Sequence, residues 1–419
     1  MSNSKGKDKN DSIRNTWNNL SNKSGLSTKD KLDKLVRLNL KKKTNEPARQ
    51  TPPPEINPTA AFVVKEAEYP LNDRYGDICL SDWHSITPST LSTLFPEEAV
   101  HDIAIDRLLY FDTETTGLSG GTGTIPFMLG FGFMDETVFK TKIFILNDIS
   151  AEEEMLEAVD QFIAEGKFSA TVTYNGRGYD FPLMETRYIL SRKRFPLLRI
   201  PHLDFLYPAR TLWKHSFDSR KLGYLGEMLL GISREDDIDG SQIPGLYFSY
   251  LRTGNFSLIR KVVYHNELDL VGLSALLLKA LKYVDDMNRT QDEGEILGTA
   301  MLYEKARILD VAEERYSFLV SSCQGDRIRE LALKRLSAIK KRAKLYGEAV
   351  VLWEQLESEN DRETHRELAI YYEHREKNYL KALAYAEKGL KKELSQLKKE
   401  DLEKRIRRLT EKIKKHEKE

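Results

Sequence analysis

The chain has 419 residues, 40% of them hydrophobic, with 65 Lys and Arg against 65 Asp and Glu. This length favours two folded units over one domain, and a net charge near zero neither supports nor excludes a nucleic-acid partner. The two cysteines, Cys79 and Cys323, are too far apart for a zinc motif and argue against a disulfide framework. No apolar run reaches the ~18–20 residues that cross a bilayer, and the N-terminus lacks the apolar core of a signal peptide. We therefore expect a cytoplasmic protein with no membrane partner.

Residues 1–58 are predicted to form a disordered basic arm and a Pro-rich linker. Residues 1–50 hold 13 Lys and Arg against 5 Asp and Glu, and most of this stretch is too polar to bury a core. TPPPEINP (51–58) is typical of an extended linker. The arm is expected either to contact phosphates or to be a solvated leader, and the sequence does not decide between these roles. Residues 59–106 are assigned to an N-terminal extension that packs on the next domain.

Residues 107–285 alternate between strand and helix patterns. In chain order we predict strands at 108–118, 126–134 and 138–146, a helix opened by a capping box from Ser150 to Glu153, a strand at 170–176, a helix over 180–193 and a long helix over 255–284. This order indicates an α/β domain with a mixed five-stranded sheet flanked by helices.

Beyond about residue 290 the pattern is wholly helical. Residues 366–392 have the pattern of paired helices, with Ala at close-packing positions, and are similar to a tetratricopeptide unit although no strict repeat is evident. Residues 394–419 place Leu and Ile on one stripe of a strongly charged helix. We assign residues 290–419 to an all-α, tetratricopeptide-like region. Structural packing is its expected role, and recognition of a protein partner is the alternative.

Acidic residues stand out in two segments of the α/β domain. In FDTETTG (111–117), Asp112 and Glu114 lie on one face of a strand, because side chains at i and i+2 point the same way. Two adjacent carboxylates are unfavourable unless a cation compensates, and Mg²⁺ or Mn²⁺ prefers such oxygen ligands. In YNGRGYDFP (174–182), Asp180 stands where a helix begins; alone, it could be a helix cap.

A third segment, YHNELDLVGL (264–273), lies in the last helix of this domain. Asp269 interrupts an apolar stripe, and His265 stands one turn earlier on the same helix face. Alone, this pair could be a buried His–Asp hydrogen bond. Asp204 likewise has two interpretations, an acid near the site or a cap for the helix expected after Pro208. The Gly-rich segment 119–123 is either a hairpin turn or a phosphate contact.

Together, the three acidic segments resemble the ordered motifs of the DEDD 3′–5′ exonuclease superfamily. The likeness is closest to its YprB-type branch, which has a Gly-rich turn after the first motif and a helical C-terminal extension. The resemblance covers about residues 107–285 and implies a ribonuclease-H-like fold that cleaves DNA or RNA. It also implies two divalent cations, Mg²⁺ or Mn²⁺, held by Asp112, Glu114, Asp180 and Asp269, with substrate contacts at Thr113, Asn175 and Tyr264.

The third motif departs from the usual pattern of the superfamily. Its relatives have Tyr four residues before the Asp or His five residues before it, whereas here His265 and Tyr264 exchange these places. A residue four positions earlier stacks on the face of Asp269, and one five positions earlier lies about 140° away. We therefore expect His265 to be the general base, with Tyr264 as the structural fallback, and the exchange leaves open which of the two serves as the base. Two alternatives stay open: a nucleic-acid-binding module or scaffold with weak or no cleavage, and a structure-specific endonuclease.

Overall fold

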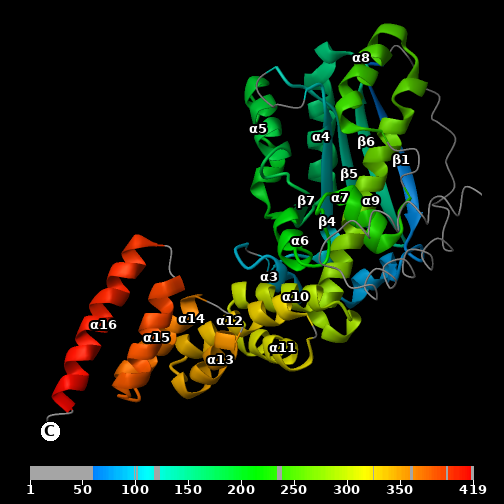
Figure 1. Cartoon of the computed structure of the whole chain (residues 1–419). Helices are drawn as coiled ribbons and strands as arrows, with labels where there is room; N and C mark the ends of the chain where they lie inside the picture. Colours follow the sequence, from blue (N-terminus) through cyan, green and yellow to red (C-terminus); the bar gives the residue numbers. More distant parts are fainter. Residues whose placement is uncertain are drawn as a thin grey trace, which may run out of the picture. The chain divides into compact units, whose positions relative to one another are not determined.

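The computed structural model describes residues 60–98, 100, 102–117, 123–233, 238–323, 325–358, 362–392 and 395–416. The expected basic arm (1–58) and most of the Gly-rich segment 119–123 lie outside these residues. Backbone contacts divide the chain into two compact units (Figure 1). The first comprises the described residues up to Ala209 together with Ser219–Lys282, and the second comprises Arg210–Asp218 and the described residues from Tyr283 onward.

The first unit contains a mixed six-stranded sheet of order β1-β6-β5-β4-β7-β8. Its strands are β1 (Phe62–Pro70), β4 (Leu108–Thr115), β5 (Pro126–Asp135), β6 (Val138–Leu146), β7 (Ala170–Thr173) and β8 (His202–Asp204). Along the sheet, β1, β6, β5 and β4 pair antiparallel. Strands β7 and β8 continue the sheet in parallel with β4. A separate two-stranded ribbon pairs β2 (Arg74–Tyr75) with β3 (Ile78–Cys79). The predicted mixed α/β sheet is therefore confirmed.

The sheet has six strands rather than the five expected. Strand β1 comes from residues ahead of the predicted boundary at 107 and pairs along its whole length with β6. Its residues are mostly half-buried, so it lacks the clean alternation that identifies a strand. Strand β8 has three residues, too few for a periodic pattern. The sequence pattern locates β4, β5, β6 and β7 along the chain, and it does not locate β1 and β8.

The helices of the first unit supply the other layers of its core. They are α3 (Pro88–Leu94), α4 (Glu152–Gly166), α5 (Asp180–Leu190), α6 (Leu206–Leu212), α7 (Leu222–Leu225), α8 (Ile243–Thr253) and α9 (Arg260–Asp285), of which α6 and α9 run on across the division between the units. One buried cluster joins the central strands to α4, α5, α8 and the first turn of α9.

The capping box expected at Ser150 is not formed. Ser150 lies in a 3₁₀ turn, Ile149–Ala151, and its backbone N–H donates to the Asp148 carboxylate at 2.9 Å. Helix α4 begins afterwards, at Glu152. Asp148 is an equally good capping residue two positions earlier, and it displaces the predicted cap.

The second unit is wholly helical, as predicted for the C-terminal region. After residues 210–218 and the end of α9, its helices are α10 (Glu293–Lys305), α11 (Leu309–Ser322), α12 (Asp326–Arg342), α13 (Tyr346–Ser358), α14 (Arg362–His374), α15 (Tyr379–Lys392) and α16 (Gln396–His416). They stack as successive pairs around two apolar clusters. Within the described residues, no helix is both long and apolar enough to span a membrane.

Candidate active site

Strand β4 carries the first two acids. It lies between β5 and β7, and all of its residues are buried except Asp112 and Glu114, which are half-buried. The register pairs Asp112 with Gly130 on β5, and it shifts just after Glu114. The two carboxylates thus lie near the end of a central strand whose backbone is fixed on both sides.

Helix α9 brings two further polar groups to these acids. The His265 Nε2 atom lies 3.3 Å from Asp269 Oδ2 and 4.0 Å from Glu114 Oε1. One residue later, the Asn266 amide donates to Asp112 Oδ2 at 2.7 Å. The first and third acidic segments therefore meet, although more than 150 residues separate them in the chain.

Asp180 reaches the same region from the first turn of α5. It is 6% exposed, and its Oδ1 accepts a hydrogen bond from the Thr113 hydroxyl at 2.5 Å. The N-cap of α5 is Tyr179, and no side-chain cap bond is formed there. Asp180 is therefore not the helix cap that its position suggested. Thr113, expected to contact substrate, uses its hydroxyl to hold this acid, and its contact with substrate stays a prediction.

The acids form one electrostatic cluster. Burial and then the charges of the other three acids, Asp180, Asp269 and Glu114, raise the pKa of Asp112 well above its usual value, although His265 opposes the shift. Burial likewise raises the pKa of Asp180 to about 6, against the hydrogen bond from Thr113. Both shifts mean that burial and mutual repulsion disfavour the ionised form of these carboxylates, and proteins normally compensate negative charge in such a place with a cation.

The chemistry of this donor set suits a hard divalent cation. The four acids offer only carboxylate oxygens, the ligands that Mg²⁺ and Mn²⁺ prefer. Among the described residues, no three His, Cys, Asp or Glu side chains are already arranged around one point as a metal cage. The fit therefore rests on the oxygen chemistry and on the repulsion among the buried acids, which raises the pKa of Asp112.

The remaining predicted residues, Asn175 and Tyr264, are both exposed. Asn175 is exposed and adopts φ of 73°, a left-handed conformation that Asn tolerates better than most residues. Tyr264 is 38% exposed, whereas His265, next to it, faces Glu114 and Asp269. His265 is thus in contact with two of the acids.

Asp204 holds the turn that precedes Asp180. It is almost fully buried at the end of β8, and its carboxylate accepts backbone N–H bonds from Asn175 at 2.8 Å and Arg177 at 3.0 Å. It also accepts the N–H of Leu206, the first residue of α6, at 3.1 Å. Asp204 therefore anchors the second-motif turn and also binds the start of α6, which begins at Leu206, ahead of the start expected after Pro208.

Two residues of this site were not predicted from the sequence. Asn266 has no exposed surface although it is polar, and Gly130 lies in a strand where glycine is unfavourable. The available signals were a polar residue at a buried position of α9 and an interior glycine in β5. Neither signal identifies its partner, since that depends on how α9 crosses the sheet.

Comparisons with known proteins agree with this geometry. Residues 109–281 match the family described as the RNase H superfamily. The chain is also 33% identical over 356 residues to "Uncharacterized protein YprB" of Bacillus subtilis (strain 168), an alignment that covers 83% of this chain and 85% of the relative. The chain belongs to the YprB family. The α/β unit of this YprB homologue is thus an RNase H superfamily domain, and the expected likeness to YprB is confirmed. The relative's name assigns it no activity, so the assignment to the DEDD exonucleases stays a prediction.

Proposed function

We propose that the protein is a metal-dependent 3′–5′ exonuclease that hydrolyses phosphodiester bonds in DNA or RNA. The supporting observation is the meeting of acids from three distant segments, which raises the pKa of Asp112 by burial and by mutual repulsion. Such a cluster is a liability for stability, and a bound cation would compensate it. In this proposal, two Mg²⁺ or Mn²⁺ ions are held by Asp112, Glu114, Asp180 and Asp269.

The side chains of the site would have separate roles in the reaction. When bound, the two cations would supply an activated water and stabilisation of the leaving oxygen. His265, between Glu114 and Asp269, would accept or orient the proton of the attacking water. Thr113 would keep Asp180 in place. Asn175 and Tyr264 are exposed, so a nucleic-acid strand would be able to reach them.

The domain boundaries belong to the same proposal. We assign residues 107–285 to the nuclease domain and residues 59–106 to an extension that is integral to it. In support, β1 pairs with β6, and the Trp83 Nε1–H donates to Ser274 on α9 at 3.2 Å. A truncated protein that begins at residue 107 is therefore expected to be less stable than one that begins at residue 59.

A cleavage assay on four substrates tests the function. The full chain would be incubated with Mg²⁺ or Mn²⁺ and 3′-labelled linear, 5′-labelled linear and circular single strands and a duplex, in DNA and RNA forms. A 3′–5′ exonuclease releases the 3′ label first and leaves circles intact, and Asp112→Asn should be inactive. Cleavage of circles would instead indicate an endonuclease. Binding without cleavage would indicate a nucleic-acid-binding module.

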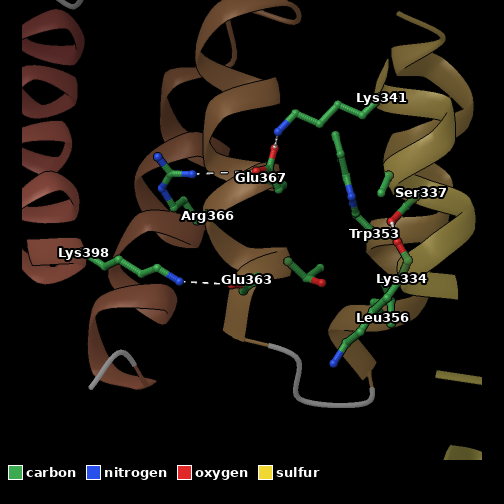
Figure 2. Close-up of a pocket in the computed structure, with 11 residues that line it drawn as sticks. Lys334, Ser337, Lys341, Trp353, Leu356, Glu363, Arg366, Glu367 and Lys398 are labelled. Atoms are coloured by element: carbon green, nitrogen blue, oxygen red, sulfur yellow. Dashed lines mark hydrogen bonds and ion pairs between the residues drawn. The ribbon is translucent and has the colours of Figure 1, made fainter. Parts of the chain in front are cut away.

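For the helical unit, we propose recognition of a protein partner through one cavity. A space of about 260 Å³ lies among α12, α13, α14 and α16 (Figure 2). Trp353 and Leu356 provide an almost fully buried apolar lining. The charged side chains that line it are Lys334, Lys341, Glu363, Arg366, Glu367 and Lys398. This set has four cations and two carboxylates. Lys334 also pairs with Glu330 at 2.6 Å and Arg366 with Asp401 at 3.4 Å, so Lys341 and Lys398 are the cations that we propose for an acidic segment.

The ion pairs of this cavity can exchange partners. Lys341 pairs with Glu367 at 2.7 Å and Lys398 with Glu363 at 3.0 Å, and both lysines are nearly half-exposed. Exposed pairs of this kind contribute ~0–1 kcal/mol, so an acidic ligand can replace them. A partner that co-purifies with the wild type should be lost from the double variant Lys341→Glu, Lys398→Glu. It should be retained by Lys388→Glu, a control on α15 outside the cavity, and equal retention by both variants would refute the assignment.

A further inference from the structure

Asn266 is a buried polar residue whose two amide atoms have different surroundings. Its Nδ2 donates to Asp112 Oδ2 at 2.7 Å. Its Oδ1 is buried and has no hydrogen-bond partner among the described residues. A half-satisfied buried amide costs free energy, so a residue retained for stability alone would be apolar at this position. The favourable contact that explains the amide is the one with Asp112.

Gly130 provides the space in which this amide lies. It is the cross-strand partner of Asp112, and a Cβ atom added to it would lie 1.8 Å from Asn266 Oδ1 and 2.8 Å from Asn266 Cγ. Gly130 is absent from the described glycines with positive φ, so its backbone does not require glycine. The requirement is one of space, because any other residue at position 130 would collide with the Asn266 side chain.

The neighbours of Asn266 hold α9 in a fixed rotation over the sheet. On one side, His265 contacts Glu114 and Asp269. On the other side, Glu267 is nearly fully buried and pairs with Lys65 on β1 at 2.6 Å. Asn266 is thus held between two anchored residues, and its amide meets Asp112 without freedom to turn away.

We propose that Asn266 is a positioning residue, which lies against Gly130 and holds one oxygen of Asp112 so that this carboxylate is oriented for a divalent cation. The cation rests on the proposed function, whereas the contact among the three residues belongs to the chain itself. Groups that hydrogen-bond to metal ligands fix their orientation, and their removal typically weakens metal affinity ~10–100-fold.

Calorimetric titration of the full metal-free chain with Mn²⁺ tests the first part. Asn266→Ala and Asn266→Leu should both bind Mn²⁺ ~10–100-fold more weakly than the wild type. The Leu variant keeps a bulky side chain, so it separates the loss of the donor from the loss of packing. Ser274→Ala is the matched control, because Ser274 is buried on the same helix and bonds Trp83, outside the site. Its Mn²⁺ affinity should equal that of the wild type.

A double-mutant cycle in thermal stability, measured without metal, tests the second part. Gly130→Ala should lower Tm in the wild type but much less in the Asn266→Ala background, where the colliding amide is gone. An equal loss of Tm in both backgrounds would refute the packing of Asn266 against Gly130. Wild-type affinity for Mn²⁺ in the Ala or the Leu variant at position 266 would refute the positioning role alone. A wild type that binds no Mn²⁺ would refute the proposed function and the role of Asn266 toward a cation, while the cycle still decides the packing.

Discussion

At the scale of single residues, the buried acids Asp112 and Asp180 link the stability of the fold to pH. The pKa of Asp112 and that of Asp180 are raised, mainly by burial. A raised pKa means that the folded protein binds more protons than the unfolded chain between ~4, the usual value, and the folded-state value. Stability is therefore lost as the pH rises through the folded pKa, which is about 6 for Asp180. The acids cost the metal-free protein stability at neutral pH.

The first prediction is that lowering the pH stabilises the metal-free protein, because the raised pKa values make stability fall as the pH rises. In the presence of a chelator, the wild type should have a Tm a few degrees higher at pH 5.5 than at pH 7.5, since each ~1 kcal/mol corresponds to ~2–4 °C in a domain of this size. Asp112→Asn removes one charge yet keeps an oxygen for Asn266, so it should be more stable than the wild type at pH 7.5 and less dependent on pH. Differential scanning calorimetry measures both. Parallel pH profiles for the two proteins would contradict the electrostatic cost.

The second prediction concerns the exchanged residues of the third motif. His265→Ala should slow cleavage ~10²–10⁴-fold, the usual contribution of a positioned acid–base group. Tyr264→Phe should have little effect, because the exposed Tyr264 loses only a hydroxyl. Rates would be compared at saturating Mn²⁺, so that weaker metal binding is not mistaken for a lost base. A severe defect in Tyr264→Phe alone would show that the general base is the tyrosine.

Residues of this site differ in how far the sequence reveals them. Asp112 and Glu114 are visible because a strand repeats every two residues, and His265 and Asp269 because a helix returns to the same face after four. Thr113 was assigned to substrate, but its contact with Asp180 depends on the position of α5 beside β4. The Asn266–Gly130 contact likewise depends on long-range packing, which local periodicity does not encode.

At the scale of helices and strands, the sequence predicts an element well where its hydrophobic pattern is long and has a recognisable start or end. The pair α14 and α15, the final helix α16 and the start of α5 all lie within a few residues of their expected places. Helix α9 begins at Arg260 rather than at residue 255, because a 3₁₀ turn, Phe256–Leu258, is capped by Asn255. Short elements such as β8 are fixed by neighbouring strands rather than by their own sequence.

A buried ion cluster joins α14 to α16. The Glu373 carboxylate has no exposed surface and accepts hydrogen bonds from Arg405, from Arg408 at 2.8 Å and from Lys412 at 3.0 Å. Burial favours the protonated form, but these cations outweigh it and hold the pKa of Glu373 at about 2. The stabilisation is therefore present above the usual pKa near ~4.3 and is lost as the pH falls toward 2.

The third prediction is that Glu373→Gln releases α16. Breaking a buried pair leaves a cation without its partner and costs ~3 kcal/mol or more, so backbone amides of α16 should exchange hydrogen at least ~100-fold faster. Hydrogen exchange followed by mass spectrometry measures this helix separately from the α/β unit. Glu411→Gln, an exposed change on α16 itself, should leave the rates unchanged. Unchanged exchange in Glu373→Gln would mean that the apolar stripe alone holds α16.

At the scale of the whole molecule, the net charge is zero, but the charged residues are unevenly distributed along the chain. Residues 1–50 carry 13 Lys and Arg against 5 Asp and Glu, so residues 51–419 carry 52 against 60. The greater part of the chain is therefore net acidic, as is the candidate site before any cation binds. A polyanionic substrate is repelled by this charge, and the basic arm is the segment whose charge opposes that repulsion.

The fourth prediction is that the arm supplies most of the salt-dependent affinity for nucleic acid. Deletion of residues 1–50 should weaken binding and flatten the plot of log affinity against log salt, because each phosphate contact contributes a slope of ~0.7–0.9 through counterion release. Fluorescence anisotropy with a labelled oligonucleotide would be measured from 50 to 200 mM salt, with Asp112→Asn as the background so that no cleavage occurs. A second variant that keeps the arm's length but changes its Lys and Arg to Gln separates charge from tethering, and it should match the deletion. If both variants keep the wild-type slope, the phosphates are contacted elsewhere and the arm is a solvated leader. If the deletion flattens the slope but the neutralised arm does not, the charge of the arm is not the cause of the salt dependence.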